Sequence, residues 1–202
     1  DIVAITGSNG KTTTTTLTGH ILQYAMRESS RQVYVAGNIG AAFSDIARSA
    51  GPQDIVVLEV SSFQLDHIGQ FRPRVSVILN ITPDHLDRYG GDFQAYANSK
   101  LRVFENQISE DVLVVNSDDY LLRDITTTTD GPRRLTISLR DEVMEGGFLA
   151  GDEMIIRFNN KEMRMPTEDL PLRGRHNLYN SLAAAVAARA MEVRSDVIRE
   201  SM

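Results

Sequence analysis

The sequence contains no cysteine, which excludes a disulfide framework and any site where thiolates bind a metal. It also lacks long hydrophobic runs: the longest apolar stretches have the length of a strand, too short to cross a membrane, and no signal-peptide pattern is visible. Basic residues are outnumbered, with 21 Lys and Arg against 27 Asp and Glu, so no basic surface is available for nucleic acid. We therefore expect neither a nucleic-acid partner nor insertion into a membrane, and the lack of cysteine fits a reducing compartment.

The rest of the composition is that of an ordinary globular domain. Hydrophobic residues make up 42% and charged residues 24% of the 202 residues, which is typical of one soluble core. A domain of this length buries roughly 70% of the surface of its unfolded chain. A charged metabolite bound at one local site remains compatible with the net charge of −6. Because the sequence starts at its first strand and stops inside a helix-like segment, we expect a domain of a longer protein.

The most informative stretch is Asp1–Thr16, DIVAITGSNGKTTTTT. Ile2–Ile5 is a short apolar run, the pattern of a buried parallel strand, and Gly7 follows where the backbone must turn. Helix signals begin at Gly10, directly before Lys11 and Thr12. In such a strand, glycine turn and helix, free N–H groups converge on an anion and the lysine adds a positive charge for the outer phosphates. Thr12 would place its hydroxyl on a bound Mg²⁺.

This turn departs from the usual Walker pattern, because Ile5 stands where the pattern has its first glycine. Gly7, Gly10, Lys11 and Thr12 are kept. One alternative therefore stays open, namely a strand-to-helix turn that uses glycines for tightness and leaves Lys11 solvated.

Strands and helices then alternate along the chain. The apolar spacing predicts helices over Thr13–Arg27, Ala41–Ala50, Phe93–Ile108 and Asn177–Met191, and strands over Gln32–Ala36, Asp54–Val60, Val75–Leu79 and Val112–Val115. From Arg134 to Met165, short runs separated by turn residues predict small antiparallel strands added to the main sheet. This order predicts an α/β fold: a doubly wound, mostly parallel sheet of the P-loop type, with helices on both faces and a small late antiparallel β patch.

Several polar residues stand at the ends of predicted strands, where ligands bind in open parallel sheets. Glu59 ends the most strand-like segment, and a buried carboxylate is costly unless it is paired or binds a cation, so we interpret it as a magnesium partner of the phosphate turn. His85 follows the next strand beside two aspartates, which favours a ligand or catalytic role. Asn38 lies between two glycines, which indicates either a close backbone approach or a simple turn. By its position alone, Lys100 reads as a snorkelling lysine at the edge of an apolar helix face.

Six segments together resemble one family. ITGSNGKTT, GNIG, EVSSFQL, NITPDHLDR, the helix with Lys100 and GRHNLYN occur in the order and approximate spacing of the central ATP-binding domain of the Mur ligases. These ATP-dependent enzymes add amino acids to the cell-wall precursor. The resemblance covers essentially the whole chain, and within the family Ser61–Leu65 resembles the members that add D-glutamate.

The resemblance implies an ATP-dependent carbon–nitrogen ligase of peptidoglycan synthesis, which joins D-glutamate to UDP-N-acetylmuramoyl-L-alanine through an acyl phosphate. It implies that residues 1–202 are the central ATP-binding domain, that the UDP-binding and amino-acid-binding domains lie outside this chain, and that the domain is inactive alone. We expect a monomer in the bacterial cytoplasm. Two alternatives remain: a Mur ligase for another amino acid, such as L-lysine or diaminopimelate, and a non-catalytic nucleotide-binding module. Glu59, His85 and Lys100 argue against the module, because a pure binder needs no second metal site.

The resemblance also implies a role for each site residue. The catalytic residues would be Lys11, His85 and Lys100. Two Mg²⁺ ions would be held, the first by Thr12 and Glu59 and the second by His85 and by Lys100 as a carbamate formed with CO₂. ATP would contact Gly7, Ser8, Asn9, Gly10, Lys11, Thr12, Thr13, Asn177 and Asn180. The muramoyl substrate would face Asn38, Ser61 and Gln64.

Overall fold

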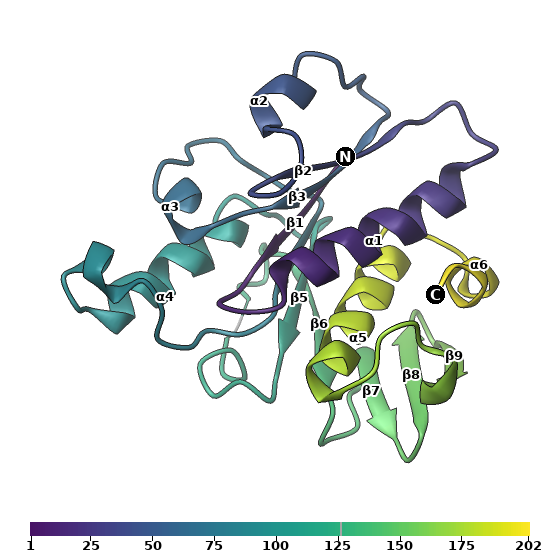
Figure 1. The fold of residues 1–202 in the computed structure, drawn as a ribbon. Helices are drawn as coiled ribbons and strands as arrows, with labels where there is room; N and C mark the ends of the chain where they lie inside the picture. Colours follow the sequence, from purple (N-terminus) through teal and green to yellow (C-terminus); the bar gives the residue numbers. More distant parts are fainter. Residues whose placement is uncertain (126) are drawn as a thin grey trace.

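The computed structural model describes residues 1–125 and 127–202, which form one nine-stranded sheet flanked by helices (Figure 1). The strands are β1 (Ile2–Thr6), β2 (Val33–Gly37), β3 (Ile55–Glu59), β4 (Val75–Ile78), β5 (Val112–Asn116), β6 (Arg133–Ser138), β7 (Gly146–Ala150), β8 (Glu153–Phe158) and β9 (Lys161–Pro166). The α-helices are α1 (Lys11–Met26), α2 (Phe43–Ile46), α3 (Ser62–Leu65), α4 (Phe93–Leu101), α5 (Arg175–Ala190) and α6 (Ser195–Ser201). Three 3₁₀ turns, η1 (Leu86–Tyr89), η2 (Arg102–Phe104) and η3 (Thr167–Asp169), complete the elements.

The strand order is β2-β3-β1-β4-β5-β6-β7-β8-β9, which places β1 between β3 and β4. All neighbours from β2 to β7 are parallel, whereas β7, β8 and β9 pair antiparallel. The predicted doubly wound, mostly parallel sheet is therefore confirmed. Because the chain crosses β1 in going from β3 to β4, the carboxyl end of β1 lies at the switch point where open α/β sheets bind ligands.

One part of the strand prediction is wrong. The first late strand, β6, is parallel to β5 and to β7, so the antiparallel patch begins only at β8. The stretch 117–132 between β5 and β6 has the dozen or more residues that a parallel return needs. Apolar periodicity indicates that a strand is present but carries no information on its direction.

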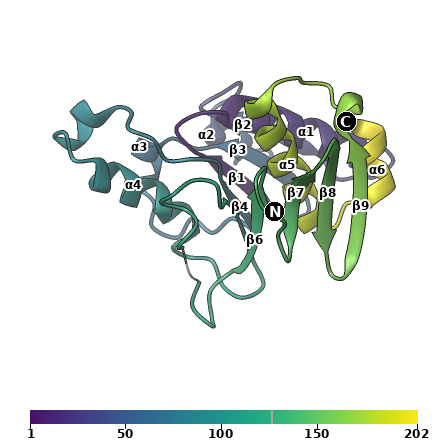
Figure 2. The ribbon, with the colours of Figure 1, turned by 90° about the horizontal axis from the view of Figure 1, so that it is seen from below.

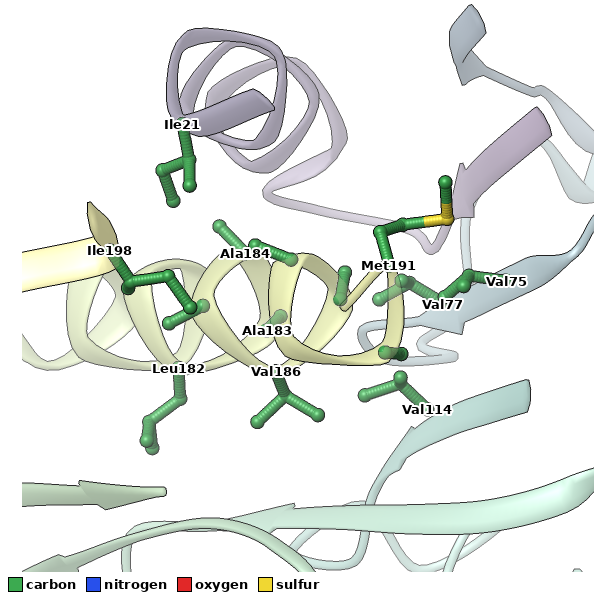
Figure 3. Close-up of a cluster of buried hydrophobic side chains, with 14 of the residues drawn as sticks. Ile21, Val75, Val77, Val114, Leu182, Ala183, Ala184, Val186, Met191 and Ile198 are labelled. Carbon is green, nitrogen blue, oxygen red and sulfur yellow. The ribbon is translucent and has the colours of Figure 1, made fainter. Parts of the chain in front are cut away.

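Helices cover the two faces of the sheet unequally. One face carries α1, α5 and α6, and the other carries α3 and α4; Figure 2 shows these two groups on opposite sides. In the first core Ile21 of α1 faces Ala184 of α5, while Leu182 and Val186 point from α5 toward the strands (Figure 3). The alanine-rich composition predicted the α5 helix, and the structure adds that its small side chains allow α1 to pack closely on it.

Two predicted helices are shorter than expected. The segment 41–50 forms only α2, in which no residue is fully buried: Phe43 and Ile46 pack half-buried against the second core, which is little burial to extend a helix. The helix predicted to reach Ile108 ends at Leu101 and continues as η2. Within residues 1–125 and 127–202, no helix combines the length and the apolar character needed to span a membrane.

The packing of α1 on α5 yields a stability prediction. Ile21 is 0% exposed, so Ile21→Ala should lower the free energy of unfolding by about 2 to 5 kcal/mol, the usual cost of a cavity at a core position. Ile108 is 40% exposed, and Ile108→Ala should cost about 1 kcal/mol or less. Urea unfolding of the 202-residue chain followed by circular dichroism measures both; equal costs would contradict the assigned core.

Candidate active site around the phosphate turn

The turn between β1 and α1 is held by the residues that follow β4. Ser8 N–H donates to the Asn80 carbonyl oxygen at 2.9 Å. The Asn80 side chain forms hydrogen bonds with both backbone groups of Asn9: it accepts from the N–H at 2.8 Å and donates to the carbonyl oxygen at 3.0 Å. The turn is therefore fixed from outside, and the N–H groups left to bind an anion are those at the start of α1, which have no acceptor within the helix.

Ser8 is buried and its hydroxyl is already engaged. Its Oγ donates to the Thr82 carbonyl at 2.8 Å and lies 2.9 Å from the Tyr96 hydroxyl, while Thr82 N–H donates to it at 3.0 Å. Ser8 thus joins the turn to the loop after β4 and to α4. Asn80 and Tyr96 were not predicted as site residues. The end of a strand was the available signal for Asn80, whereas Tyr96 reads as one more apolar residue of its helix.

Gly10 is required where it stands. Its φ is 85°, and a Cβ there would lie 2.4 Å from Asn180 Oδ1. The same Asn180 oxygen accepts from Thr14 Oγ1 at 3.2 Å, and its amide donates to Asn177 Oδ1 at 3.2 Å. The structure therefore brings Asn177 and Asn180 at the start of α5 to the phosphate turn. Ile5, at the position of the absent Walker glycine, is a fully buried residue of β1.

Lys11 does not extend into solvent. Its Nζ donates to the carbonyl oxygens of Gly7 at 2.9 Å and Ser8 at 3.0 Å, so the ammonium group lies over the turn. Lys11 is therefore half-buried against the turn, which disfavours the alternative of a fully solvated lysine. Backbone carbonyls are weak partners for an ammonium group compared with a charged phosphate, and this lysine can exchange them for one.

A buried carboxylate lies next to the turn. Glu59 is 2% exposed, and its two oxygens accept from Thr12 Oγ1 at 2.9 Å and from Asn38 Nδ2 at 3.2 Å. Gly37 brings β2 close to it, because a Cβ there would lie 2.2 Å from the Glu59 carbonyl oxygen. Among the described residues no salt bridge involves Glu59.

The Glu59 site fits Mg²⁺. A buried carboxylate satisfied only by neutral donors is costly, and a cation relieves that cost. A hydroxyl and a carboxylate are the oxygen ligands that Mg²⁺ takes alongside substrate phosphates and water. In the part of the chain that the structure describes, no three His, Asp or Glu side chains converge into a ready-made metal cluster. The phosphates of a bound nucleotide would therefore have to complete the coordination.

Lys100 is buried, which contradicts its reading as a snorkelling residue. It is 2% exposed, its Nζ donates to the Gly7 carbonyl at 2.9 Å and lies 4.7 Å from the centroid of the Tyr96 ring. Burial, with a further contribution from the Lys11 charge, lowers the pKa of Lys100 to about 7. A sizeable fraction of the side chain is then a neutral, nucleophilic amine at neutral pH.

His85 lies on the exposed loop after β4. Its φ of 50° is in the left-handed region, and its Nε2 is 3.5 Å from Asp84 Oδ2. The imidazole packs edge-on against the Phe63 ring, with the centroids 5.6 Å apart. In the part of the chain that the structure describes, no hydrogen bond or ion pair joins His85 to Lys100 or Glu59, so these three predicted metal residues do not touch one another.

Ser61 and Gln64 bond to each other at the start of α3. Ser61 N–H and Oγ donate to Gln64 Oε1 at 2.8 and 2.9 Å, and Gln64 N–H donates back to Ser61 Oγ at 3.4 Å. This capping box satisfies the free N–H groups of the short helix. Gln64 is exposed, so its amide N–H₂ remains available to a ligand.

An apolar groove of about 510 Å³ begins at the first turn of α1 and lies between α1, the segment before α5 and the end of α6. It is lined by Thr12, Thr13, Thr16, Leu17, His20, Pro171, Leu172, Ser201 and Met202. Its contact with Thr12 and Thr13 makes it continuous with the start of α1. A flat group attached to the phosphates, such as the base of a nucleotide, has room there.

The fold and the phosphate turn define a P-loop-type nucleotide-binding domain, and the comparisons give its family. The family profile described as Mur ligase middle domain matches residues 5–188, so the chain belongs to the Mur ligase family. It is 52% identical over 206 residues to the UDP-N-acetylmuramoylalanine--D-glutamate ligase of Salinibacter ruber, covering 100% of this chain and 45% of that protein. The protein of the same name from Chloroherpeton thalassium is 39% identical, with 100% and 46% covered. The chain thus spans about half the length of these relatives.

Solved structures agree on the fold. A UDP-N-acetylmuramoyl-L-alanyl-D-glutamate--2,6-diaminopimelate ligase superposes with a TM-score of 0.73 at 24% identity, covering 98% of this chain and 45% of that one. MurF from Acinetobacter baumannii gives 0.75 at 20% identity, with 100% and 44% covered. The predicted family resemblance is confirmed.

The position of Lys11 predicts its contribution to nucleotide binding. Lys11→Ala removes the Lys11 ammonium group at the start of α1 and should weaken binding of MgATP about 10- to 100-fold, since a hydrogen bond to a charged group contributes roughly 1.5 to 3 kcal/mol. Isothermal calorimetry on the 202-residue chain measures the affinity. Lys161→Ala, an exposed lysine on β9, is the matched control and should bind like the wild type. An unchanged affinity in Lys11→Ala would contradict the phosphate-turn assignment.

Proposed function

We propose that this chain is the central ATP-binding domain of a longer ATP-dependent ligase, which adds D-glutamate to UDP-N-acetylmuramoyl-L-alanine in peptidoglycan precursor synthesis. The observation that carries the ligase chemistry is the convergence of Lys11 and Lys100 on the Gly7 carbonyl oxygen, next to the buried Glu59–Thr12 pair. The choice of D-glutamate is supported by the relatives that align with the whole chain, which are named as D-glutamate ligases.

The proposed reaction has two stages. A carboxylate does not react with an amine at neutral pH, so the substrate carboxylate first attacks the γ-phosphate of ATP, forms an acyl phosphate and releases ADP. The amine of D-glutamate then attacks the acyl carbon, and the tetrahedral intermediate collapses with loss of phosphate. Both stages bring anions together, which is why positive groups must surround the phosphates.

Lys11 and the start of α1 would bind the phosphates. In this role the Lys11 ammonium group leaves the Gly7 and Ser8 carbonyls for the outer phosphates, and the free N–H groups of α1 hold the inner ones. Thr12 and Glu59 would hold the first Mg²⁺. Two bound Mg²⁺ ions would neutralise charge on the phosphates and on the attacking carboxylate. His85 would stabilise the oxyanion of the tetrahedral intermediate.

Lys100 would act as a carbamate. Its neutral amine nitrogen attacks the carbon of CO₂, an N–C bond forms, and one proton leaves the nitrogen for solvent, so a cationic group becomes an anionic one. The burial of Lys100 and the nearby Lys11 charge support this change, because both disfavour its ammonium form. With His85, the carbamate would hold the second Mg²⁺.

The remaining site residues would contact the substrates. Asn177 and Asn180 would lie near the adenine, which is supported by the contact of Asn180 with the phosphate turn. Asn38, Ser61 and Gln64 would face the muramoyl substrate; Asn38 and Gln64 are exposed at the edge of the sheet where substrate would enter. The expectations of a monomer and of a cytoplasmic location in bacteria belong to the same proposal.

The two alternatives receive less support. The solved structures include a diaminopimelate ligase, but at 24% identity this similarity supports only the fold and not the choice of amino acid. A non-catalytic nucleotide binder would have no need of a lysine that is 2% exposed and lies against a second lysine, because burying that ammonium group costs stability.

The proposed activity is tested with the full-length protein that contains this chain. It should form ADP, phosphate and an amide from UDP-N-acetylmuramoyl-L-alanine when D-glutamate is supplied, and should not do so with L-lysine or diaminopimelate. The 202-residue chain should fold but form no amide, since effective molarity is lost when the reacting groups are not held about 3 to 3.5 Å apart. Product with another amino acid would assign a different ligase, and full activity in the 202-residue chain would show that the substrate sites are misplaced.

The carbamate is tested separately. Lys100→Ala in the full-length protein should lower kcat by about 100-fold or more, as loss of a charge-stabilising group does in other enzymes. Added short carboxylic acids should restore part of the rate by occupying the vacated space, whereas Lys161→Ala should need no rescue. Failure of every such acid, together with an unmodified Lys100 in density from crystals held at high CO₂, would contradict the carbamate.

A further inference from the structure

Phe63 stands in the middle of the Ser61–Leu65 motif, and the proposed function gives it no role. It is not a core residue: in the described part of the chain it belongs to none of the hydrophobic clusters, nor to the apolar side chains packed against them. A large aromatic ring outside the cores, in a site that binds charged groups, calls for another explanation.

The Phe63 ring contacts two residues of the loop after β4. The His85 imidazole meets it edge-on, with a centroid distance of 5.6 Å and an interplanar angle of 76°. The Arg88 guanidinium lies 4.2 Å from its centroid. T-shaped aromatic pairs and cation–π contacts are both favourable arrangements. The His85 side chain is otherwise 57% exposed, and its one ion-pair partner, Asp84, is 3.5 Å away.

The helix that carries Phe63 is itself fixed. The Ser61–Gln64 capping box closes its first turn. Its Ser62 carbonyl accepts from Ser99 Oγ at 2.7 Å, directly before Lys100 on α4. The Tyr89 hydroxyl, at the end of η1, donates to Ser99 Oγ at 3.2 Å, so the helix is also tied to the loop of His85. The hydrogen bonds of Ser99 therefore connect α3 both to the segment that follows His85 and to the helix that carries Lys100.

We propose that Phe63 is a positioning residue that seats the imidazole of His85 at the second cation site. This inference rests on the proposed function, which gives His85 its role. A half-exposed side chain on a loop samples several rotamers, and a metal ligand must be held in one of them. The Phe63 ring restricts the imidazole, and His85 itself has a left-handed backbone conformation. The capping box of Ser61 and Gln64 serves the same end, because it sets the direction of Phe63.

The positioning role of Phe63 predicts a specific kinetic change in the full-length protein. Phe63→Leu should lower kcat and raise the Mg²⁺ concentration for half-maximal rate, each by about 10-fold, the usual effect of losing a partner that orients a metal ligand. KM for ATP should not change, because Lys11 and Thr12 are untouched. Phe63→Tyr keeps the ring and should retain wild-type behaviour. Phe71→Leu, a partly buried phenylalanine before β4 at the opposite edge of the sheet, is the matched control and should leave the Mg²⁺ dependence unchanged.

A second readout needs neither metal nor activity. In a protein with ¹³C-labelled histidine, the His85 ring protons should carry a ring-current shift from Phe63, assigned by its absence in His85→Ala. Phe63→Leu should abolish this shift and Phe63→Tyr should keep it. Melting temperatures establish that each variant is folded, and Phe63→Met provides a second replacement without a ring.

The double variant distinguishes the positioning role of Phe63 from the proposed function. Phe63→Leu/His85→Ala should be no worse than His85→Ala alone, since both changes remove one unit. If the losses of rate in the two single variants add in the double variant, the positioning role of Phe63 is wrong and the proposed function stands. The same holds if Phe63→Leu has the wild-type rate while His85→Ala is slower. A His85→Ala enzyme with wild-type rate and Mg²⁺ dependence would overturn the metal role of His85 and the positioning role of Phe63 with it.

Discussion

The Nζ groups of two lysines, Lys11 and Lys100, donate to one carbonyl oxygen, that of Gly7. Two positive charges that share one acceptor repel each other, and the low exposure of Lys100 prevents water from screening them fully. The structure tolerates this arrangement because the surrounding backbone is held by Asn80 and Tyr96. The pocket is therefore prepared for anions, and either a bound phosphate or a change in the charge of Lys100 would relieve the repulsion.

The sheet and the helix α5 hold this arrangement in place. β1 lies between β3 and β4, so Glu59 and Asn80 approach the turn from its two neighbouring strands. On the helical side, the buried alanines of α5 allow α1 to pack closely, and Asn180 touches Gly10 as a result. The start of α1 is thereby fixed by strands and helix together, which keeps its free N–H groups in one direction.

The residues of the site differ in how firmly the fold holds them. Thr12, Glu59 and Lys100 are bonded to buried elements and need little reordering to bind a ligand. His85 is on an exposed loop, where it contacts the Phe63 ring and lies near Asp84. Ordering such a side chain on binding costs conformational entropy, and a preformed aromatic contact reduces that cost.

The sequence by itself determined the alternation of strands and helices, the phosphate turn and the placement of polar residues at strand ends, because these depend on local spacing and glycine chemistry. Only the tertiary structure decided the direction of β6 and the burial of Lys100. Strand direction depends on the path of the connecting chain, and burial depends on which elements pack over a side chain. Neither is encoded in apolar periodicity, so Lys100 reads as an ordinary surface lysine until α4 is placed against the phosphate turn.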